Sequence, residues 1–206
     1  MLLQEYRPFK VNKQLAEQAV KSKKTLIVQG VLQRADTKNE NGRVYPKEIL
    51  EREIKAYMGG PIKENRAMGE LDHPESSVIN LQNVSHTIKK CWWEGDNVMG
   101  DVEILNTPAG NILKALFAAG ITVGISSRGM GSVSENVAEG TVTVEDDFEL
   151  LCWDFVSTPS TQGAFMTPTI NKNINEGKSE LPEYKYTNVN NIIRDIICDN
   201  TGMCKC

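Results

Sequence analysis

Apolar and polar residues along the middle of the chain follow patterns that predict mainly strands. The segment 25–35 is rich in Leu, Ile and Val and predicts a strand. Residues 83–105 contain two β-rich runs around the polar turn Glu94–Asn97, which predicts a hairpin. We expect further strands at the start of 121–134 and in two segments of 141–160. The central part of the chain is therefore predominantly β.

Two segments instead have the spacing of amphipathic helices. Residues 43–60 have Pro46 near the predicted first turn and end in two glycines, and their apolar stripe consists of Ile49, Leu50, Ile54 and Tyr57. Residues 108–120 begin with a proline and end at a glycine, which predicts a second helix. Residues 61–80 contain two prolines and predict a long loop. Strands with two inserted helices indicate an α+β fold.

The composition changes after Pro168 and suggests three parts of the chain. Residues 1–24 are polar and basic and are expected to form an N-terminal segment. Residues 25–168 carry the strand and helix patterns and are expected to form the domain. Residues 169–206 are polar and predict a linker followed by a tail.

Composition and charge exclude several functional classes. The 206 residues are 40% apolar and 24% charged, which argues against global disorder and allows a sizeable core. The net charge of −4 argues against a dominant nucleic-acid function, because phosphate binding needs an excess of Lys and Arg. There is no apolar stretch of about 20 residues and no signal-peptide pattern at the N-terminus. We therefore expect a soluble, intracellular protein that binds neither nucleic acid nor membrane.

The five cysteines do not indicate a disulfide framework, because their number is odd and the chain is long. Cys198, Cys204 and Cys206 crowd the last nine residues and could ligate zinc with a fourth group. Their spacing is not that of a common zinc site, which favours incidental thiols. We therefore expect no cofactor and no metal.

The chain contains only two histidines, so any histidine-dependent chemistry involves one of them. His86 lies in an alternating run between Ser85 and Thr87, which favours a structural role in a strand. His73 lies in the proline-bounded string MGELDHPE at 68–75. It is either an exposed loop residue or a general base at a surface cleft.

A second candidate is the string VGISSRGMGS at 123–132, where an apolar strand ends in two serines. In one interpretation the glycines simply permit a tight bend. In the other they allow backbone N–H groups to face an oxyanion beside a serine nucleophile. Successive strand residues point to opposite faces, so only one of Ser126 and Ser127 should face a cleft. Local sequence does not decide which one.

A third candidate is Asp154, which stands between Trp153 and Phe155 in an apolar run. A buried carboxylate needs a partner, and a histidine whose tautomer must be fixed is a suitable one. The alternative is an aspartate that points outward from an edge strand.

Several sequence motifs follow one another along the chain, and the set in this order is much more specific for a protein family than any one motif. They extend from about Val28 to Pro168 and comprise NGRVYPKEIL at 41–50, GELDHP at 69–74, CWWEGDNV at 91–98, GISSRGMGS and WDFVSTPS. This set resembles the prohead core proteases of T-even tailed phages, serine endopeptidases related to the herpesvirus assemblins. The resemblance implies a mostly antiparallel, barrel-like β core with surrounding helices, as in the herpesvirus proteases.

The same resemblance implies functional residues. His73 corresponds to the catalytic base, Ser126 to the nucleophile and Asp154, less directly, to the third triad member. Related proteases have a histidine in that third position, and His86 is kept as a reserve candidate although it comes early in the chain. The oxyanion and substrate-binding group is expected at the segment that follows the nucleophile, with Ser127, Arg128 and Gly129.

Substrates and partners are also implied by the resemblance. Prohead proteases cut scaffold, core and major capsid proteins after Glu in a Leu/Ile-x-Glu context inside the assembling prohead in the host cytoplasm, and they process and associate with themselves. Ile174-Asn175-Glu176 lies in the predicted linker, so we expect self-cleavage after Glu176. Further short matches end at Glu5, Glu64 and Glu183. The alternatives are a catalytically inactive scaffold component of the same fold and a binding module organised by the cysteine tail.

Overall fold

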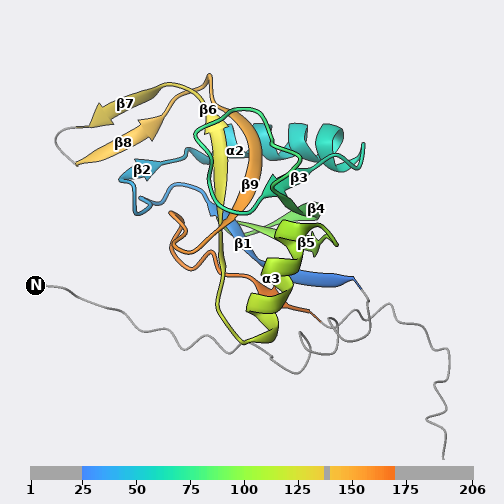
Figure 1. Cartoon of the computed structure of the whole chain (residues 1–206). Helices are drawn as coiled ribbons and strands as arrows, with labels where there is room; N and C mark the ends of the chain where they lie inside the picture. Colours follow the sequence, from blue (N-terminus) through green and yellow to red (C-terminus); the bar gives the residue numbers. More distant parts are fainter. Residues whose placement is uncertain (1–24, 137–139, 170–206) are drawn as a thin grey trace, which may run out of the picture. The chain divides into compact units, whose positions relative to one another are not determined.

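The computed structural model describes residues 25–136 and 140–169, and the strands of this part form three sheets (Figure 1). A five-stranded sheet has the order β10-β1-β5-β4-β3, a three-stranded sheet the order β2-β8-β7, and a two-stranded ribbon joins β6 to β9. The strands are β1 Leu26–Arg34, β2 Arg43–Val44, β3 Met68–Glu70, β4 Val84–Glu94, β5 Asn97–Ile104, β6 Gly124–Met130, β7 Val133–Asn136, β8 Thr141–Val144, β9 Glu149–Val156 and β10 Thr167–Pro168.

The predicted hairpin is the centre of the five-stranded sheet. Strands β4 and β5 pair antiparallel around a tight turn at Gly95, whose φ of 62° lies in the region that glycine adopts without strain. Burial alternates along β5, so Val98, Val102 and Ile104 face the core. Strand β1 pairs with the other edge of β5, as the apolar run 25–35 predicts for a buried strand.

Both predicted helices are present in the described part of the chain. Helix α2, Lys47–Tyr57, buries Leu50, Ile54 and Tyr57 and continues into a short π-helix at Met58–Ile62. Helix α3, Pro108–Ala118, is capped at its N-terminus by Thr107, whose hydroxyl accepts the N–H of Gly110.

The predicted long loop at 61–80 is partly wrong, because it contains the short strand β3, Met68–Glu70. Three residues are too few to show an alternating pattern. The strand forms because β4 offers it an edge, and Gly69 lets it approach closely. A Cβ at Gly69 would collide with the carbonyl of Trp153 and the ring of His86.

The α+β class with mostly antiparallel strands and two helices is confirmed, and the described strands form three separate sheets with no closed barrel among them. Single-residue bridges, Leu71 to Phe155 and Gly124 to Phe165, connect the two-stranded ribbon to the larger sheet. The ladders of the three sheets are therefore not continuous with one another. The main core lies between these elements, and Trp153, Phe155 and Phe117 are fully buried in it.

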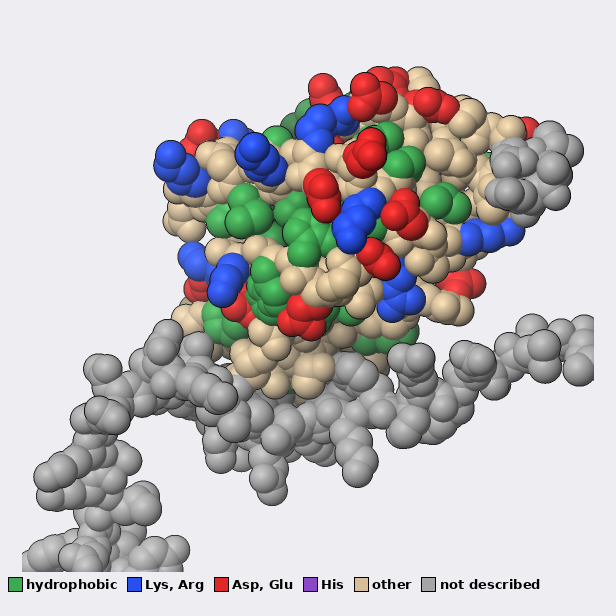
Figure 2. Space-filling model, turned by 180° about the vertical axis from the view of Figure 1, so that it is seen from behind, with side chains coloured by type: hydrophobic (Ala, Val, Ile, Leu, Met, Phe, Trp, Pro, Cys, Tyr) green, Lys and Arg blue, Asp and Glu red, His purple; other side chains and the backbone are tan. Residues whose placement is uncertain are grey.

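The surface of the described domain has no single dominant sign of charge on the face seen in Figure 2. Lys and Arg side chains alternate there with Asp and Glu side chains around scattered apolar residues. Among the described residues, no helix is long and apolar enough to cross a membrane.

Candidate active site

The two-stranded ribbon has one polar and one apolar face. Strands β6 and β9 pair in a register that sets Ser126 opposite Asp154 and Arg128 opposite Cys152. Directly opposed residues of an antiparallel pair project to the same side, so these four side chains share one face. The residues between them project to the other side, where Trp153 and Phe155 enter the core.

The loop between β3 and β4 brings His73 to the polar face of the ribbon. Asp72 takes a positive φ of 70°, which Asp tolerates better than most residues, and its N–H donates to the carbonyl of Phe155 at 2.8 Å. The Asp72 carboxylate accepts the N–H of His73 at 3.0 Å. The first bond ties the loop to strand β9 directly before His73, and the second fixes the backbone of His73 to its neighbour.

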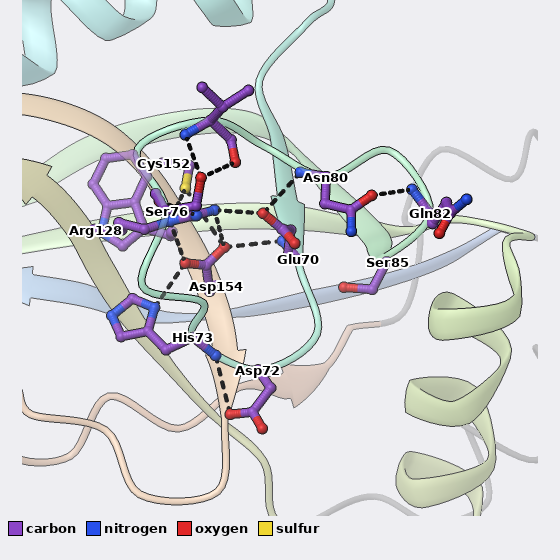
Figure 3. Close-up of polar contacts among 12 residues, drawn as sticks. Glu70, Asp72, His73, Ser76, Asn80, Gln82, Ser85, Arg128, Cys152 and Asp154 are labelled. Atoms are coloured by element: carbon purple, nitrogen blue, oxygen red, sulfur yellow. Dashed lines mark hydrogen bonds and ion pairs between the residues drawn. The ribbon is translucent and has the colours of Figure 1, made fainter.

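His73 and Asp154 are in direct contact (Figure 3). The Nδ1 atom of His73 lies 2.7 Å from Oδ2 of Asp154, whose side chain is fully buried, while 38% of the His73 side chain is exposed. An ionised carboxylate only accepts hydrogen bonds, so the Nδ1 atom carries the proton. The Nε2 atom is then free to accept a proton from another group.

The environment of Asp154 keeps this carboxylate ionised. Burial alone would raise the pKa of Asp154, but the hydrogen bonds from His73 and from the Glu70 N–H, together with the charge of Arg128, lower the pKa below its ordinary value. The expectation that a carboxylate in this apolar run is buried and has a histidine partner is therefore confirmed.

Arg128 is buried on the same face and contacts two carboxylates. Its Nη2 atom donates to Oε1 of Glu70 at 2.9 Å, and its Nε atom lies 3.0 Å from Oδ2 of Asp154. Its Nη1 atom donates to the carbonyl of Ser76 at 2.7 Å, and a weaker bond reaches the sulfur of Cys152. The guanidinium thus faces the carboxylates and the loop of His73, so the oxyanion contact expected of it stays a prediction.

Ser126 is buried and its hydroxyl shares a hydrogen bond of 3.1 Å with the hydroxyl of Ser160. Its position opposite Asp154 places it on the same face as the His73 partner. Within the described residues no hydrogen bond joins Ser126 to His73. Catalytic hydrogen bonds are often long before substrate binds, so this separation does not argue against a nucleophile.

The two other residues expected near an oxyanion lie beside Ser126 on β6. Ser127 is half-buried and stands opposite Trp153, so its side chain is on the apolar face. Gly129 packs against β9, where a Cβ would lie 2.6 Å from the carbonyl of Glu149. Any oxyanion contact of these two residues would therefore use backbone N–H groups.

The second histidine lies in the core. His86 is fully buried between β4 and β9, where it bonds to the hydroxyl of Ser85 and to the carbonyl of Trp153, each at 2.9 Å. Burial lowers the pKa of His86 to about 4, so the ring is neutral at physiological pH. It does not contact Asp154 directly, and His73 instead occupies the position beside the carboxylate.

Glu70 and Ser160 belong to this neighbourhood and were not selected from the sequence. Glu70 lies in the string GELDHP and Ser160 in WDFVSTPS, which were both singled out for other residues. Nothing in the local sequence pattern distinguishes Glu70 or Ser160 from its neighbours in these strings. The predicted cleavage residue Glu176 and the cysteines Cys198, Cys204 and Cys206 lie outside the described residues. Among residues 25–136 and 140–169 no cluster of His, Cys, Asp and Glu is arranged to hold a metal ion.

A hydroxyl, an imidazole and a buried carboxylate around one strand pair are the groups that serine peptidases use. The sequence model described as prohead core protein serine protease matches residues 5–178 of this chain. The chain therefore belongs to the prohead core protein serine protease family, a family of peptidases.

Individual relatives agree with this membership. The prohead core protein protease of Enterobacteria phage T4 is 34% identical over 146 residues, which are 69% of this chain and 68% of the relative. The solved structure of the bacteriophage T4 capsid assembly protease has 32% sequence identity and a TM-score of 0.62, and the match covers 65% of this chain and 82% of that one. The resemblance inferred from the sequence strings is confirmed.

Proposed function

We propose that this chain is a serine endopeptidase of phage capsid assembly, with Ser126 as nucleophile, His73 as general base and Asp154 as the orienting carboxylate. The observation that carries the proposal is the 2.7 Å contact between His73 and Asp154 on the ribbon face where Ser126 stands opposite Asp154. Family membership supports the reaction class.

The proposed reaction is acyl transfer to Ser126. The Nε2 atom of His73 takes the hydroxyl proton as the Ser126 oxygen attacks the scissile carbonyl, and Asp154 stabilises the imidazolium that forms. The imidazolium then gives its proton to the leaving amine as the peptide bond breaks. Water then attacks the ester carbonyl of the acyl-enzyme while Nε2 of His73 takes its proton. The ester bond to Ser126 breaks, His73 returns the proton to the Ser126 oxygen, and the acid product leaves.

The edge of β6 offers a backbone donor for the oxyanion. The N–H of Ile125 points away from β9, because it donates to the carbonyl of Ala164 at 2.9 Å. Strand alternation directs the N–H of Ser127 to the same edge, next to the Ser126 oxygen. This donor supports an oxyanion role for Ser127 through its backbone, with Gly129 providing room for a tight approach to β9.

The proposed substrates are core, scaffold and major capsid proteins, cleaved after Glu in a Leu/Ile-x-Glu context inside the prohead. We further propose self-association and self-cleavage after Glu176. The competing match Ile62-Lys63-Glu64 begins in the π-helix Met58–Ile62 and continues into a turn. Proteases bind extended backbone, so this match is a poor substrate in the folded chain. We also propose that the β core is barrel-like and related to the fold of the herpesvirus proteases.

A peptide assay tests the proposed reaction. The probe is a fluorogenic peptide with the chain's own sequence Ile-Asn-Glu-Gly, and kcat/KM is measured for the wild type and for Ser126→Ala. We expect hydrolysis after Glu by the wild type and a loss of several orders of magnitude in the variant. Equal rates, or no cleavage of either the peptide or a core protein, would favour the inactive scaffold component of the same fold.

Intact-mass measurement tests the self-cleavage. The wild type should lose the segment after Glu176, whereas Ser126→Ala and Glu176→Gln should stay intact. The matched control is Glu64→Gln, which removes the competing site and should be processed like the wild type. An intact C-terminus in active wild-type enzyme would contradict this part of the proposal.

A further inference from the structure

Glu70 is a fully buried carboxylate that the proposed reaction does not use. Its Oε1 atom accepts hydrogen bonds from Arg128 at 2.9 Å and from the N–H of Asn80 at 3.1 Å. Its Oε2 atom is also buried and has no hydrogen-bond partner among the described residues. Burial of a carboxylate is costly, so this position requires a physical reason.

Glu70 contacts the candidate active site through both its backbone and its side chain. Its backbone N–H donates to Oδ1 of Asp154 at 2.9 Å, while its side chain binds the guanidinium that contacts the other oxygen of the same carboxylate. Arg128 also holds the carbonyl of Ser76, three residues after His73. Glu70 therefore helps to fix both Asp154 and the loop that carries the imidazole (Figure 3).

The charges of this cluster do not cancel within it. Two buried carboxylates, Glu70 and Asp154, share one guanidinium, so the cluster carries one excess negative charge. Protonation of the adjacent imidazole of His73 removes this excess. The imidazolium is the species that the acyl-transfer step creates.

The other titratable groups near His73 do not remove the excess. Burial raises the pKa of Cys152 to about 12, so this thiol is neutral. The charged or titratable residues around the imidazole are Asp154 and Cys152 on β9, Arg128 on β6, Glu70 on β3, and Asp72 and Glu75 on its own loop. Of these, Asp72 and Glu75 are both exposed, so solvent screens their charges.

We propose that Glu70 is a positioning residue of this site, which acts through Arg128 and Asp154 to hold His73 in place and supplies the negative charge that favours its protonated form. Without this charge, Arg128 would offset Asp154 and leave the imidazolium poorly stabilised. The inference rests on the proposed role of His73 as general base.

The test is the pH dependence of kcat/KM for three variants on the Ile-Asn-Glu-Gly peptide at constant ionic strength. Removal of a negative charge in Glu70→Gln should move the acid limb to lower pH by about 0.5 to 1 unit and lower the plateau about tenfold. Removal of the positive charge in Arg128→Gln should move the limb in the opposite direction. The double variant should return the limb to within about 0.3 unit of the wild type, because both charges are gone.

The double variant also protects the test against misfolding, because it leaves no buried charge of this pair without its partner. Glu75→Gln is the matched control: it removes the same charge from an exposed position on the loop of His73 and should leave the profile unchanged. Acid limbs that coincide in all folded variants would overturn the inference and leave Glu70 a purely structural residue. If the wild type is inactive or Ser126→Ala retains activity, the proposed function itself fails instead.

Discussion

The two faces of the β6–β9 ribbon come from the same strands and differ completely in what they contact. One face carries Ser126, Arg128, Cys152 and Asp154 and lies against the loop of His73. The other carries Ile125, Ser127, Trp153 and Phe155, and three of these four are fully buried in the core. A shift of one residue in either strand would move that strand's polar residues to the apolar face and its apolar residues to the polar face.

This comparison shows how a polar site is built next to an apolar core. The apolar residues fix the ribbon by packing, and Trp153 is further held by a hydrogen bond from His86 to its carbonyl. The carboxylate of Asp154 is thereby held against His73, with which it makes a contact of 2.7 Å. Packing on one face therefore determines geometry on the other.

The largest difference between the faces should come from the adjacent serines. Ser126→Ala should lower kcat/KM by about 10⁴- to 10⁶-fold, because it removes the nucleophile. Ser127→Ala changes a side chain on the opposite face and should cost less than about tenfold, because its backbone N–H remains. Peptide hydrolysis by both variants measures this ratio. A larger loss in Ser127→Ala would mean that the wrong serine was chosen.

The next largest effect is expected at the carboxylate. Asp154→Asn should lower kcat by about 10⁴-fold, because an amide no longer fixes the Nδ1–H form of His73. Asp146→Asn makes the same chemical change in an exposed side chain of a turn and should leave kcat within about twofold. Steady-state kinetics of the two variants, with thermal unfolding as a check of folding, provides the measurement. Comparable losses in both would contradict the role of Asp154.

On the apolar face, truncation should reduce stability rather than chemistry. Phe155→Ala removes a fully buried ring that contacts His86 and Phe117 edge to face, and should lower the free energy of unfolding by about 3 to 5 kcal/mol. Denaturant titration measures this loss in the Ser126→Ala background, which prevents self-cleavage. A free energy of unfolding within about 1 kcal/mol of the Ser126→Ala parent would show that this face is not packed as described.

The smallest predicted effect concerns the buried histidine beneath the ribbon. The pKa of His86 is lowered from its ordinary 6.5 to about 4 in the folded protein, so between these values the unfolded chain binds a proton that the native state does not. Stability is thus unaffected above about pH 6.5 and falls as the pH decreases toward 4. Between pH 6.5 and 5 the loss should be about 2 kcal/mol.

Unfolding curves at several pH values measure this slope, and His86→Gln should flatten it. The lowered pKa of Asp154 acts only below its ordinary value of 3.8 and does not interfere in this range. A slope that persists in His86→Gln would assign the effect to another group.

Much of the fold could be predicted because its elements have strong local patterns. The hairpin of β4 and β5 and the helices α2 and α3 were predicted with bounds that differ by a few residues from those observed. Strand β3 could not be predicted, since its three residues pair only because β4 is already there. The separation of the strands into three open sheets likewise depends on which edges meet.

The candidate site was predictable in part. His73, Ser126 and Asp154 were selected from separate strings, and the structure sets them around one ribbon. Glu70 and Ser160 were missed, because an acidic residue before a loop histidine and a serine after a strand are ordinary local features. Only their distances to Arg128 and to Ser126 distinguish them.

The sequence by itself determined the order of strands and helices, the family, and the alternation that separates Ser126 from Ser127, because these depend on residues close together in the chain. The tertiary structure alone decided that His73 meets Asp154 and that Glu70 and Arg128 complete the buried cluster. Those contacts join residues 58 to 81 positions apart. Their energies depend on burial and on the sum of nearby charges, and neither is set until the sheets have packed.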